Sequence, residues 1–429
     1  MTEPSTPATP ATPGSPTTPG TPVTPGTPGT PATPADTGRT TEFEHDVVEL
    51  LTETAREATA CESRSAGTEH LVHMLVMGET KAGEAIAPGM RQAGGLGGTV
   101  MALTSPDSSR PWVHGDTAAG PDPLPGHPGD EAEADAVWRE AVWRAARKKA
   151  RRGAPEEGTF PPEPSEALRA CLLRALRLAR LEGTTSVRCR HVARAMLQLP
   201  DSRALEAMAL QRIDRTAASV ALDALDAGAA ADPDFPEPPS VRGMRGTGVL
   251  GEGGGLSRLL MSWMFRSGPE GDGLLSSVFL EAERQTVRRG HGVVEPVDLL
   301  LAVLALDRAL AVTGRSFPET TAAVNEAAAL LRTYGARHAS LAEAARACVA
   351  DPLPGPLPAA TEVPRSPAVE RVRSVAQLTA GERGSDTVGT VHVLAALLAD
   401  DEGEAALLLR AEGVDVAALK DRLSPDPAA

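Results

Sequence analysis

Apolar residues recur along most of this chain at the spacing of a buried helix face. The first such stripe comprises Val47, Leu50, Leu51, Ala55 and Ala58, which is the i, i+3, i+4, i+7 pattern of an amphipathic helix. The stripe returns three times, at Leu168, Cys171, Leu172, Ala175, Leu176 and Ala179, at Leu275, Val278, Phe279 and Ala282, and at Val372, Val375, Ala376 and Ala380. The pattern predicts an all-α protein built from four copies of one helical unit.

A second helix is expected shortly after each stripe. The four copies are aligned on Gly67, Arg188, Glu295 and Gly389. In this alignment two positions are apolar in every copy, and we call them the apolar columns: Leu71/Val192/Leu299/Val393 and Leu75/Met196/Val303/Leu397. Further helices are expected at about 90–103, 203–226, 318–334 and 404–423. A unit of about 60 residues buries too little apolar surface to be stable alone, so the copies are expected to pack in pairs.

Proline and glycine divide the chain into segments. Residues 1–40 form a Pro/Thr/Gly tract with almost nothing to bury, which predicts a disordered tail. A first domain is expected at 41–227, with repeats at 43–104 and 163–226 around an insertion at 105–162. A flexible linker is expected at 228–270, and a second domain at 271–425 with repeats at 272–335 and 366–424.

The composition and net charge of the chain limit the classes of partner that it is expected to bind. The formal net charge of -15 opposes binding to nucleic acid or to an anionic membrane. No secretory signal pattern opens the sequence, and no run of about 18 apolar residues predicts a membrane span. We therefore expect a cytoplasmic protein that binds neither nucleic acid nor membrane.

The stretch SAGTEHLVHML, Ser65 to Leu75, places polar side chains at one predicted helix start. Gly67 supplies a turn, Thr68 is suited to the N-cap, and the carboxylate of Glu69 would face the positive end of the helix dipole. His70 shares its column with His191, His392 and Asp298. His70 and His73 have the spacing of a metal-binding pair, but no third ligand is evident, so a structural histidine is the favoured interpretation and no metal or other cofactor is predicted.

The first copy, EATACESRSAGTEHLVHMLVMGETKAGEAI, resembles the Clp N-terminal (Clp repeat) domain of ClpA/ClpC-type unfoldases. The fourth copy, VGTVHVLAALLADDEGEAALLLRAEGVDVAAL, keeps the same pattern, whereas the second and third copies are more divergent. The resemblance implies two tandem all-helical domains, each a pseudo-twofold pair of repeats. It also implies recognition of the substrates and adaptors of an unfoldase.

The resemblance further implies a ligand site at Gly67, Thr68 and Glu69, because ClpC-type members bind phosphorylated arginine through this acid. The residues at the position of Glu69 in the other copies are Arg190, Val297 and Val391, so only the first copy has the carboxylate. A carboxylate is a natural partner for a guanidinium. The alternative interpretation of Glu69 is an acid that stabilises a helix start by a few tenths of a kcal/mol.

Catalytic motifs are missing from the 429 residues. An ATPase module of an unfoldase needs GxxxxGK[ST], yet none of the four lysines follows a glycine, and the sequence contains neither GxSxG nor HExxH. We therefore predict a non-catalytic, stand-alone protein-binding module without AAA+ modules. It would act as an adaptor or regulator of Clp-dependent proteolysis, with Clp components or arginine-phosphorylated substrates as partners.

Two other functions are compatible with the same features. One is a decoy or resistance protein that sequesters small peptides targeting Clp unfoldases. The other is an enzyme with an unrecognised site, for which Glu69, His70 and His73 would be the first candidates.

Two further stretches remain open at the level of sequence. Residues 138–152 predict a basic helix, either an inserted helix whose Trp138 packs on the first domain or a contact for an acidic partner or nucleic acid. Residues 256–265, LSRLLMSWMF, predict a short docking helix for the protein's own groove or for another protein.

Overall fold

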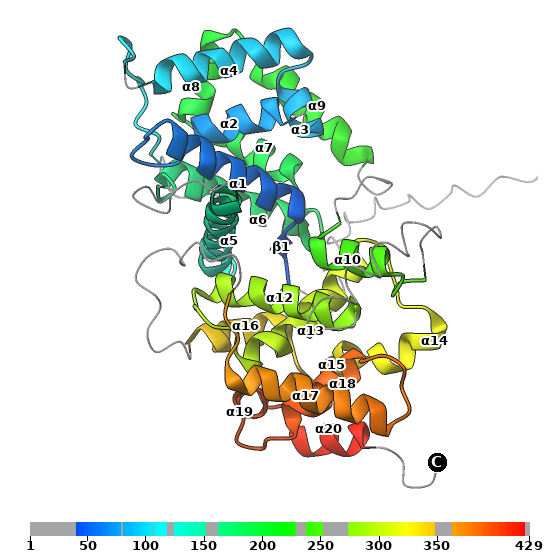
Figure 1. The fold of residues 1–429 in the computed structure, drawn as a ribbon. Coiled ribbons are helices and arrows are strands. Elements are labelled where there is room, and N and C mark those ends of the chain that lie inside the picture. The colour runs from blue at the N-terminus through cyan, green and yellow to red at the C-terminus, as the bar shows by residue number, and fades with distance from the viewer. Residues whose placement is uncertain are drawn as a thin grey trace, which may run out of the picture. The chain divides into compact units, whose positions relative to one another are not determined.

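Helices make up nearly all of the regular structure, which confirms the all-α prediction (Figure 1). The predicted tail at 1–40 falls outside the described residues except for Thr40, and so does the whole of the predicted docking helix at 256–265. A computed structural model describes residues 40–78, 80–105, 107–117, 124–151, 162–228, 237–251, 273–347 and 363–424.

The N-terminal half, defined as the described residues between 40 and 228, contains two copies of the helical unit and one inserted helix. Its elements are β1 (Glu42–Phe43), α1 (His45–Ala60), α2 (Thr68–Met77), α3 (Lys81–Ile86), α4 (Met90–Thr104), the inserted α5 (Asp130–Arg151), α6 (Glu166–Leu181), β2 (Ser186–Val187), α7 (Cys189–Gln198), α8 (Arg203–Leu210) and α9 (Arg215–Gly228).

The C-terminal half, defined as the described residues between 237 and 424, contains the other two copies of the helical unit with the additional helix α10 in front. Its elements are α10 (Pro239–Thr247), α12 (Gly273–Arg289), α13 (Pro296–Val312), α14 (Glu319–Ala322), the 3-10 turn η2 (Ala323–Asn325), α15 (Ala327–Thr333), α16 (His338–Ala347), α17 (Pro367–Glu382), α18 (Thr390–Leu398), α19 (Glu404–Ala411) and α20 (Val416–Leu423).

The apolar stripes and columns of the sequence form the cores. Every residue of the four stripes is buried except Val375, which is partly buried, and both apolar columns are buried throughout. Each half has its own hydrophobic core. Burial of the stripes on α1, α6, α12 and α17 therefore stabilises these amphipathic helices against the rest of each core.

Short backbone pairings relate the two copies within each half. β1 precedes the first helix of copy one and pairs in parallel with β2, which precedes the second helix of copy two. Ala66, before α2, pairs with Pro164, before α6, and Val294, before α13, pairs with Arg365, before α17. In both halves, the residues before the second helix of one copy thus meet those before the first helix of its neighbour.

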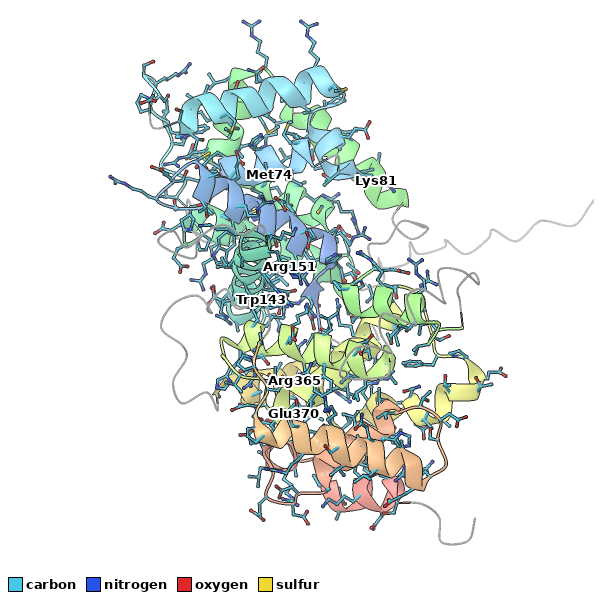
Figure 2. All side chains as sticks on the ribbon, in the orientation of Figure 1. Met74, Lys81, Trp143, Arg151, Arg365 and Glu370 are labelled. Atoms are coloured by element: carbon cyan, nitrogen blue, oxygen red, sulfur yellow. The ribbon has the colours of Figure 1, made fainter. Side chains whose placement is uncertain are left out.

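The inserted helix α5 contributes to both cores. Trp138, Ala141, Val142 and Ala145 belong to the N-terminal core, as expected for an inserted helix, and Trp143 belongs to the C-terminal core. Figure 2 labels Trp143 and Arg151 on this helix. The basic end of α5 contacts acids of the same chain, because Lys148 Nζ lies 2.5 Å from Glu49 and 3.1 Å from Glu53.

The segment expected to be a flexible linker, 228–270, contains a packed helix in its described part. Val241 and Met244 of α10 are fully buried in the C-terminal core, and Leu250 is also buried there. Three apolar residues, spaced among glycines and arginines, are enough to anchor this short helix. The domain and linker boundaries drawn from the sequence stay a prediction.

Buried ion pairs connect the two halves. Glu140 of α5 is fully buried and accepts hydrogen bonds from Arg144 (2.8 Å), Arg284 (3.1 Å) and Arg288 (3.0 Å). Burial alone would raise the pKa of Glu140, but the three surrounding guanidinium groups lower it to about 2. The carboxylate is therefore ionised, and two of its three partners come from the C-terminal half.

A second buried pair lies beside the first. Arg308 of α13 donates to Glu44 at 2.6 Å and to the carbonyl oxygen of Thr185 at 2.6 Å. Here too the acid comes from the N-terminal half and the arginine from the C-terminal half.

The glycines of α4 offer a test of helix propensity. Gly98 is exposed, and a Cβ added there would have no neighbour within 4 Å. Gly98→Ala should therefore raise the free energy of unfolding by about 0.5 to 1 kcal/mol, because alanine reduces the backbone entropy of the unfolded chain.

Gly97 provides the matched control in urea denaturation. It is buried, and a Cβ there would lie 3.2 Å from both the His73 ring and the Met77 sulfur. Gly97→Ala should give no gain or a loss of stability, and equal gains for both variants would contradict the assignment of the two faces of α4.

Candidate functional site

The aligned helix starts share one capping arrangement. The N-cap residues of α2, α7, α13 and α18 are Gly67, Arg188, Glu295 and Gly389. In each copy the N-cap N–H donates to the side chain three residues later, at 3.0 Å to His70, 2.8 Å to His191, 2.9 Å to Asp298 and 2.9 Å to His392. The His column therefore satisfies a backbone donor at each helix start.

The same side chains connect the helix start to the end of the preceding helix. The second ring nitrogen lies 3.0 Å from the Ser63 hydroxyl for His70 and 2.9 Å from Glu182 for His191. Asp298 instead accepts from Arg289 at 2.7 and 3.0 Å. The change from His to Asp in copy three is thus matched by a cation at the end of α12.

Burial keeps His70 neutral. Desolvation is the main cause that lowers the pKa of His70 to about 4. A neutral ring can accept at Nδ1 and donate at Nε2, which is what the contacts with Gly67 and Ser63 require. Both ring nitrogens are therefore occupied within the chain.

In three of these four helices, the first backbone N–H donates a hydrogen bond to a side-chain oxygen of a distant segment. Thr68 N donates to Asp116 at 2.9 Å, Cys189 N to Asp46 at 3.3 Å, and Thr390 N to Asn325 at 3.0 Å. In copy three the equivalent position is Pro296, which has no N–H to satisfy.

The predicted ligand residues Gly67, Thr68 and Glu69 lie together but face inward. Thr68 is the first residue of α2 and Gly67 is the N-cap, which corrects the suggestion that Thr68 is the cap. Thr68 is fully buried, and Glu69 is 1% exposed. A Cβ at residue 67 would lie 2.1 Å from Glu69 Oε2, so only glycine allows the carboxylate to fold back over the turn.

Glu69 is already bound to a guanidinium of its own chain. Arg203, at the start of α8, donates to Glu69 Oε1 at 2.8 Å. Burial is the main cause that raises the pKa of Glu69 to about 7, the nearby Asp116 carboxylate adds to the shift, and Arg203 offsets part of it. Arg190 occupies the position of Glu69 in copy two, and its guanidinium lies 2.7 Å from the Glu182 carboxylate.

Asp116 is the residue of this site that sequence reasoning missed. Its carboxylate accepts from the Thr68 amide and hydroxyl, from the Ser165 hydroxyl and from the Arg203 amide at 3.2 Å. It therefore holds the starts of α2, α6 and α8 together. Asp116 lies in a Gly/Pro-rich break, and its only local signal is an aspartate able to adopt a left-handed backbone, with φ of 55°.

Asp116→Asn should lower the free energy of unfolding by about 2 kcal/mol. Asparagine tolerates the same backbone but turns one oxygen into a donor, and because each Asp116 oxygen accepts two hydrogen bonds, two buried donors at two of the three helix starts lose their acceptor.

Asp201→Asn is the matched control, because Asp201 also has a left-handed backbone, with φ of 54°, while its side chain is 69% exposed. Its unfolding free energy in urea should stay within about 0.5 kcal/mol of the wild-type value. Equal losses for the two variants would contradict the role of Asp116.

Within the described ranges, no three His, Cys, Asp or Glu side chains are grouped so that they could hold a metal ion. Among the described helices, none combines the length and the apolar character needed to cross a membrane.

The arrangement defines an all-helical protein of repeated units whose helix starts are capped by side chains of the same chain. The family model of the Clp repeat (R) N-terminal domain matches residues 322–412 and 366–425. The second match begins where the predicted fourth repeat begins, at 366. Residues 322–425 therefore carry a Clp repeat domain, and the resemblance is confirmed for this part of the chain. No curated protein matches the chain.

Proposed function

We propose that this protein is a non-catalytic protein-binding module that acts as an adaptor or regulator of Clp-dependent proteolysis. The observation that carries the proposal is the Clp repeat domain at 322–425, a domain type that serves protein interaction. The four helix starts support a binding role over catalysis, because their polar side chains are used to cap helices. Within the 429 residues, the sequence motif of a phosphate-binding loop is missing.

The direct test is a degradation assay with a ClpC-type unfoldase, its peptidase and a fluorescent substrate. An adaptor should increase the rate of substrate loss, and a competing regulator should decrease it, at a concentration where the chain binds the unfoldase or the substrate in biolayer interferometry. Absence of both binding and any rate change would overturn the proposal.

Recognition of arginine-phosphorylated partners at Gly67, Thr68 and Glu69 is part of the proposal. An incoming guanidinium would have to displace Arg203, whose side chain is 26% exposed and holds the carboxylate. Arg203→Gln should therefore increase the affinity for phosphoarginine in calorimetry, and a second change, Glu69→Gln, should remove the gain. Equal affinity in the wild type and both variants would place arginine recognition elsewhere.

A decoy function is favoured by one observation in the C-terminal half. A cavity of about 260 Å³ lies between copies three and four, where Val324 and Leu330 face Val391 and Leu423. The wall also contains charged side chains, among them Glu326, Arg383 and Arg422, and a pocket with this mixed lining suits a small peptide. Calorimetric titration with a cyclic peptide that targets Clp unfoldases tests it, and Val391→Asp should abolish any heat of binding that belongs to this cavity.

A further inference from the structure

An imidazole and a thioether lie beside each other where α2 packs against α4 (Figure 1). His73 and Met77 are one helical turn apart on α2, so their side chains share a face. A Cβ at residue 97 of α4 would lie 3.3 Å from His73 Nε2 and 3.2 Å from Met77 Sδ. Both atoms therefore border the same small gap, which exists because Gly97 has no side chain.

Glu57 of α1 orients the imidazole from its other side. Its Oε1 atom lies 3.4 Å from His73 Nδ1. The pKa of Glu57 is lowered, chiefly by hydrogen bonding with His73, so the carboxylate is ionised and favours a proton on Nδ1. Nε2 then keeps its lone pair. A carboxylate on one nitrogen of the ring, with the other nitrogen available, is the arrangement found around metal-ligating histidines.

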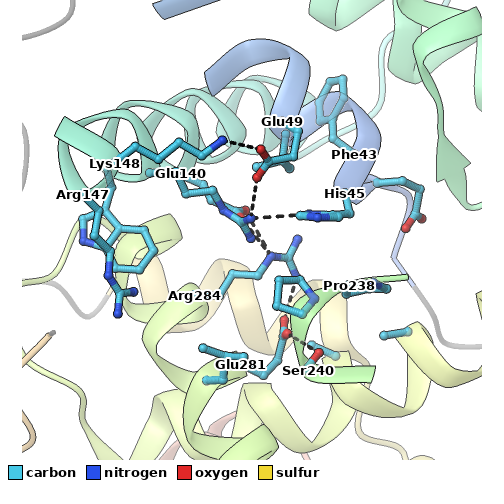
Figure 3. Close-up of a pocket in the computed structure, with 18 of the residues that line it drawn as sticks. Phe43, His45, Glu49, Glu140, Arg147, Lys148, Pro238, Ser240, Glu281 and Arg284 are labelled. Carbon is cyan, nitrogen blue, oxygen red and sulfur yellow. Dashed lines mark hydrogen bonds and ion pairs between the residues drawn. The ribbon is translucent and has the colours of Figure 1, made fainter. Parts of the chain in front are cut away.

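His73 Nε2 differs from the other polar groups of the chain because it is not already used. Among the described residues it has no hydrogen-bond partner. By contrast, both ring nitrogens of His70 and of His191 contact groups of the same chain. The cations around the cavity between the two halves are also held by acids of the chain, as Lys148 is by Glu49 (Figure 3). The fold thus orients His73 Nε2 and leaves it available.

Methionines give the neighbourhood of this nitrogen a soft character. Met77 is 50% exposed, so its thioether can turn toward the ring nitrogen. Met101 is 44% exposed and follows Gly97 by one turn of α4, which places it on the same face of that helix. Two uncharged sulfur ligands are therefore open to solvent beside one oriented imidazole.

These ligand types select the class of ion. Zn²⁺ and Ca²⁺ need larger sets of His, Cys or carboxylate ligands, and the described ranges hold no such group. Thioether sulfur is a soft ligand that favours Cu(I), and imidazole also suits copper. The ionised Glu57 behind the ring further favours a positive charge on the far side.

We propose that His73 Nε2 and the thioethers of Met77 and Met101 bind a soft monovalent metal ion, Cu(I). The ion would link α2 to α4 at the gap beside Gly97. This inference is independent of the proposed function, because it concerns a site on the outer side of α2 and needs no Clp component.

The test uses the full chain with Cys61→Ser and Cys348→Ser, because free thiolates also bind Cu(I). Cys171 and Cys189 are buried and stay unchanged. In the presence of ascorbate, this protein competes for Cu(I) with the coloured chelator bicinchoninate. We expect it to remove a single equivalent of Cu(I) from the chelator. The methyl signal of Met77 should then shift in the NMR spectrum of methyl-labelled protein.

Methionine variants in the same background locate the ion. Met77→Leu conserves volume but removes the sulfur, and it should weaken Cu(I) binding at least about tenfold, or about 1.4 kcal/mol. Met101→Leu should weaken binding in the same direction. Met90→Leu is the matched control, because Met90 is 93% exposed at the start of α4, about 10 Å along the helix from Gly97. Its affinity should equal that of the unmodified background.

Two glycine variants test the gap itself. Gly97→Ala places a methyl group between the two ligand atoms and should also weaken binding at least about tenfold. Gly98→Ala is its control, because a Cβ there meets nothing within 4 Å and the affinity should not change. Thermal unfolding without metal verifies that each variant is folded.

Three results would overturn the proposal. One is failure of the protein to take Cu(I) from the chelator, and another is equal affinity in Met77→Leu and Met90→Leu. The third is equal loss in Gly97→Ala and Gly98→Ala, which would indicate non-specific binding by surface methionines. If Met101→Leu binds as tightly as the background, the assignment of Met101 fails.

Discussion

Glu140→Ala should lower the free energy of unfolding by about 3 to 5 kcal/mol. The carboxylate is fully buried and accepts hydrogen bonds from Arg144, Arg284 and Arg288. Its removal leaves one buried positive charge uncompensated, because Arg144, Arg284 and Arg288 keep other carboxylate partners but lose the one that they share. A broken buried ion pair costs far more than a surface one. Urea denaturation followed by circular dichroism measures the change.

Asp135→Ala on the same helix is the control. Asp135 pairs with Arg169 at 3.0 Å, but both side chains are nearly half exposed. A surface pair of this kind contributes at most about 1 kcal/mol, so the variant should remain close to the wild type. A double variant, Glu140→Ala with Arg284→Met, should recover part of the loss. Similar losses for Asp135→Ala and Glu140→Ala would contradict the buried network.

Glu69→Gln should change the dependence of stability on pH. The pKa of Glu69 is raised from its ordinary value of 4.5 to about 7, chiefly by burial. The folded chain therefore binds this proton more tightly than the unfolded chain, and stability falls as pH rises from 4.5 to 7. The full difference is about 3 kcal/mol, reached above pH 7.

Paired urea denaturation curves between pH 4.5 and 8.5 test this expectation. Glutamine does not titrate, so the variant should gain about 3 kcal/mol on the wild type over this range. Glu140→Gln is expected to show no such change over this pH range, because the pKa of Glu140 is lowered to about 2. The stabilisation by the ionised Glu140 is lost only as pH falls below 4.5. A constant difference between Glu69→Gln and wild type at every pH would contradict the raised pKa.

Much of the fold could be predicted because it depends on local periodicity. The stripe that begins at Val47 and the columns through Leu71 and Leu75 are buried, since helix spacing alone decides which side chains share a face. Histidine recurs at the position of His70 in three of the four copies, and the contact of its ring with the N-cap N–H explains the recurrence.

The rest depends on contacts between residues far apart in sequence. Glu140 and Arg284 are separated by 144 residues, and neither has a local pattern that predicts burial of a charge. Glu69 could be singled out as the only acid in its column, but its partner Arg203 follows 134 residues later. Asp116 lies in a loop, where periodicity gives no information.

The placement of α5 has a consequence for synthesis of the chain. This helix is complete before α10, α12 and α13 exist, yet Trp143 packs in their core and Glu140 takes two of its counter-charges from Arg284 and Arg288. An emerging N-terminal half therefore exposes an indole and an acid that has only Arg144 of its three guanidinium partners until the C-terminal half follows. During translation the N-terminal half therefore cannot complete its folding alone. A chain that ends between the two halves would expose apolar surface and aggregate.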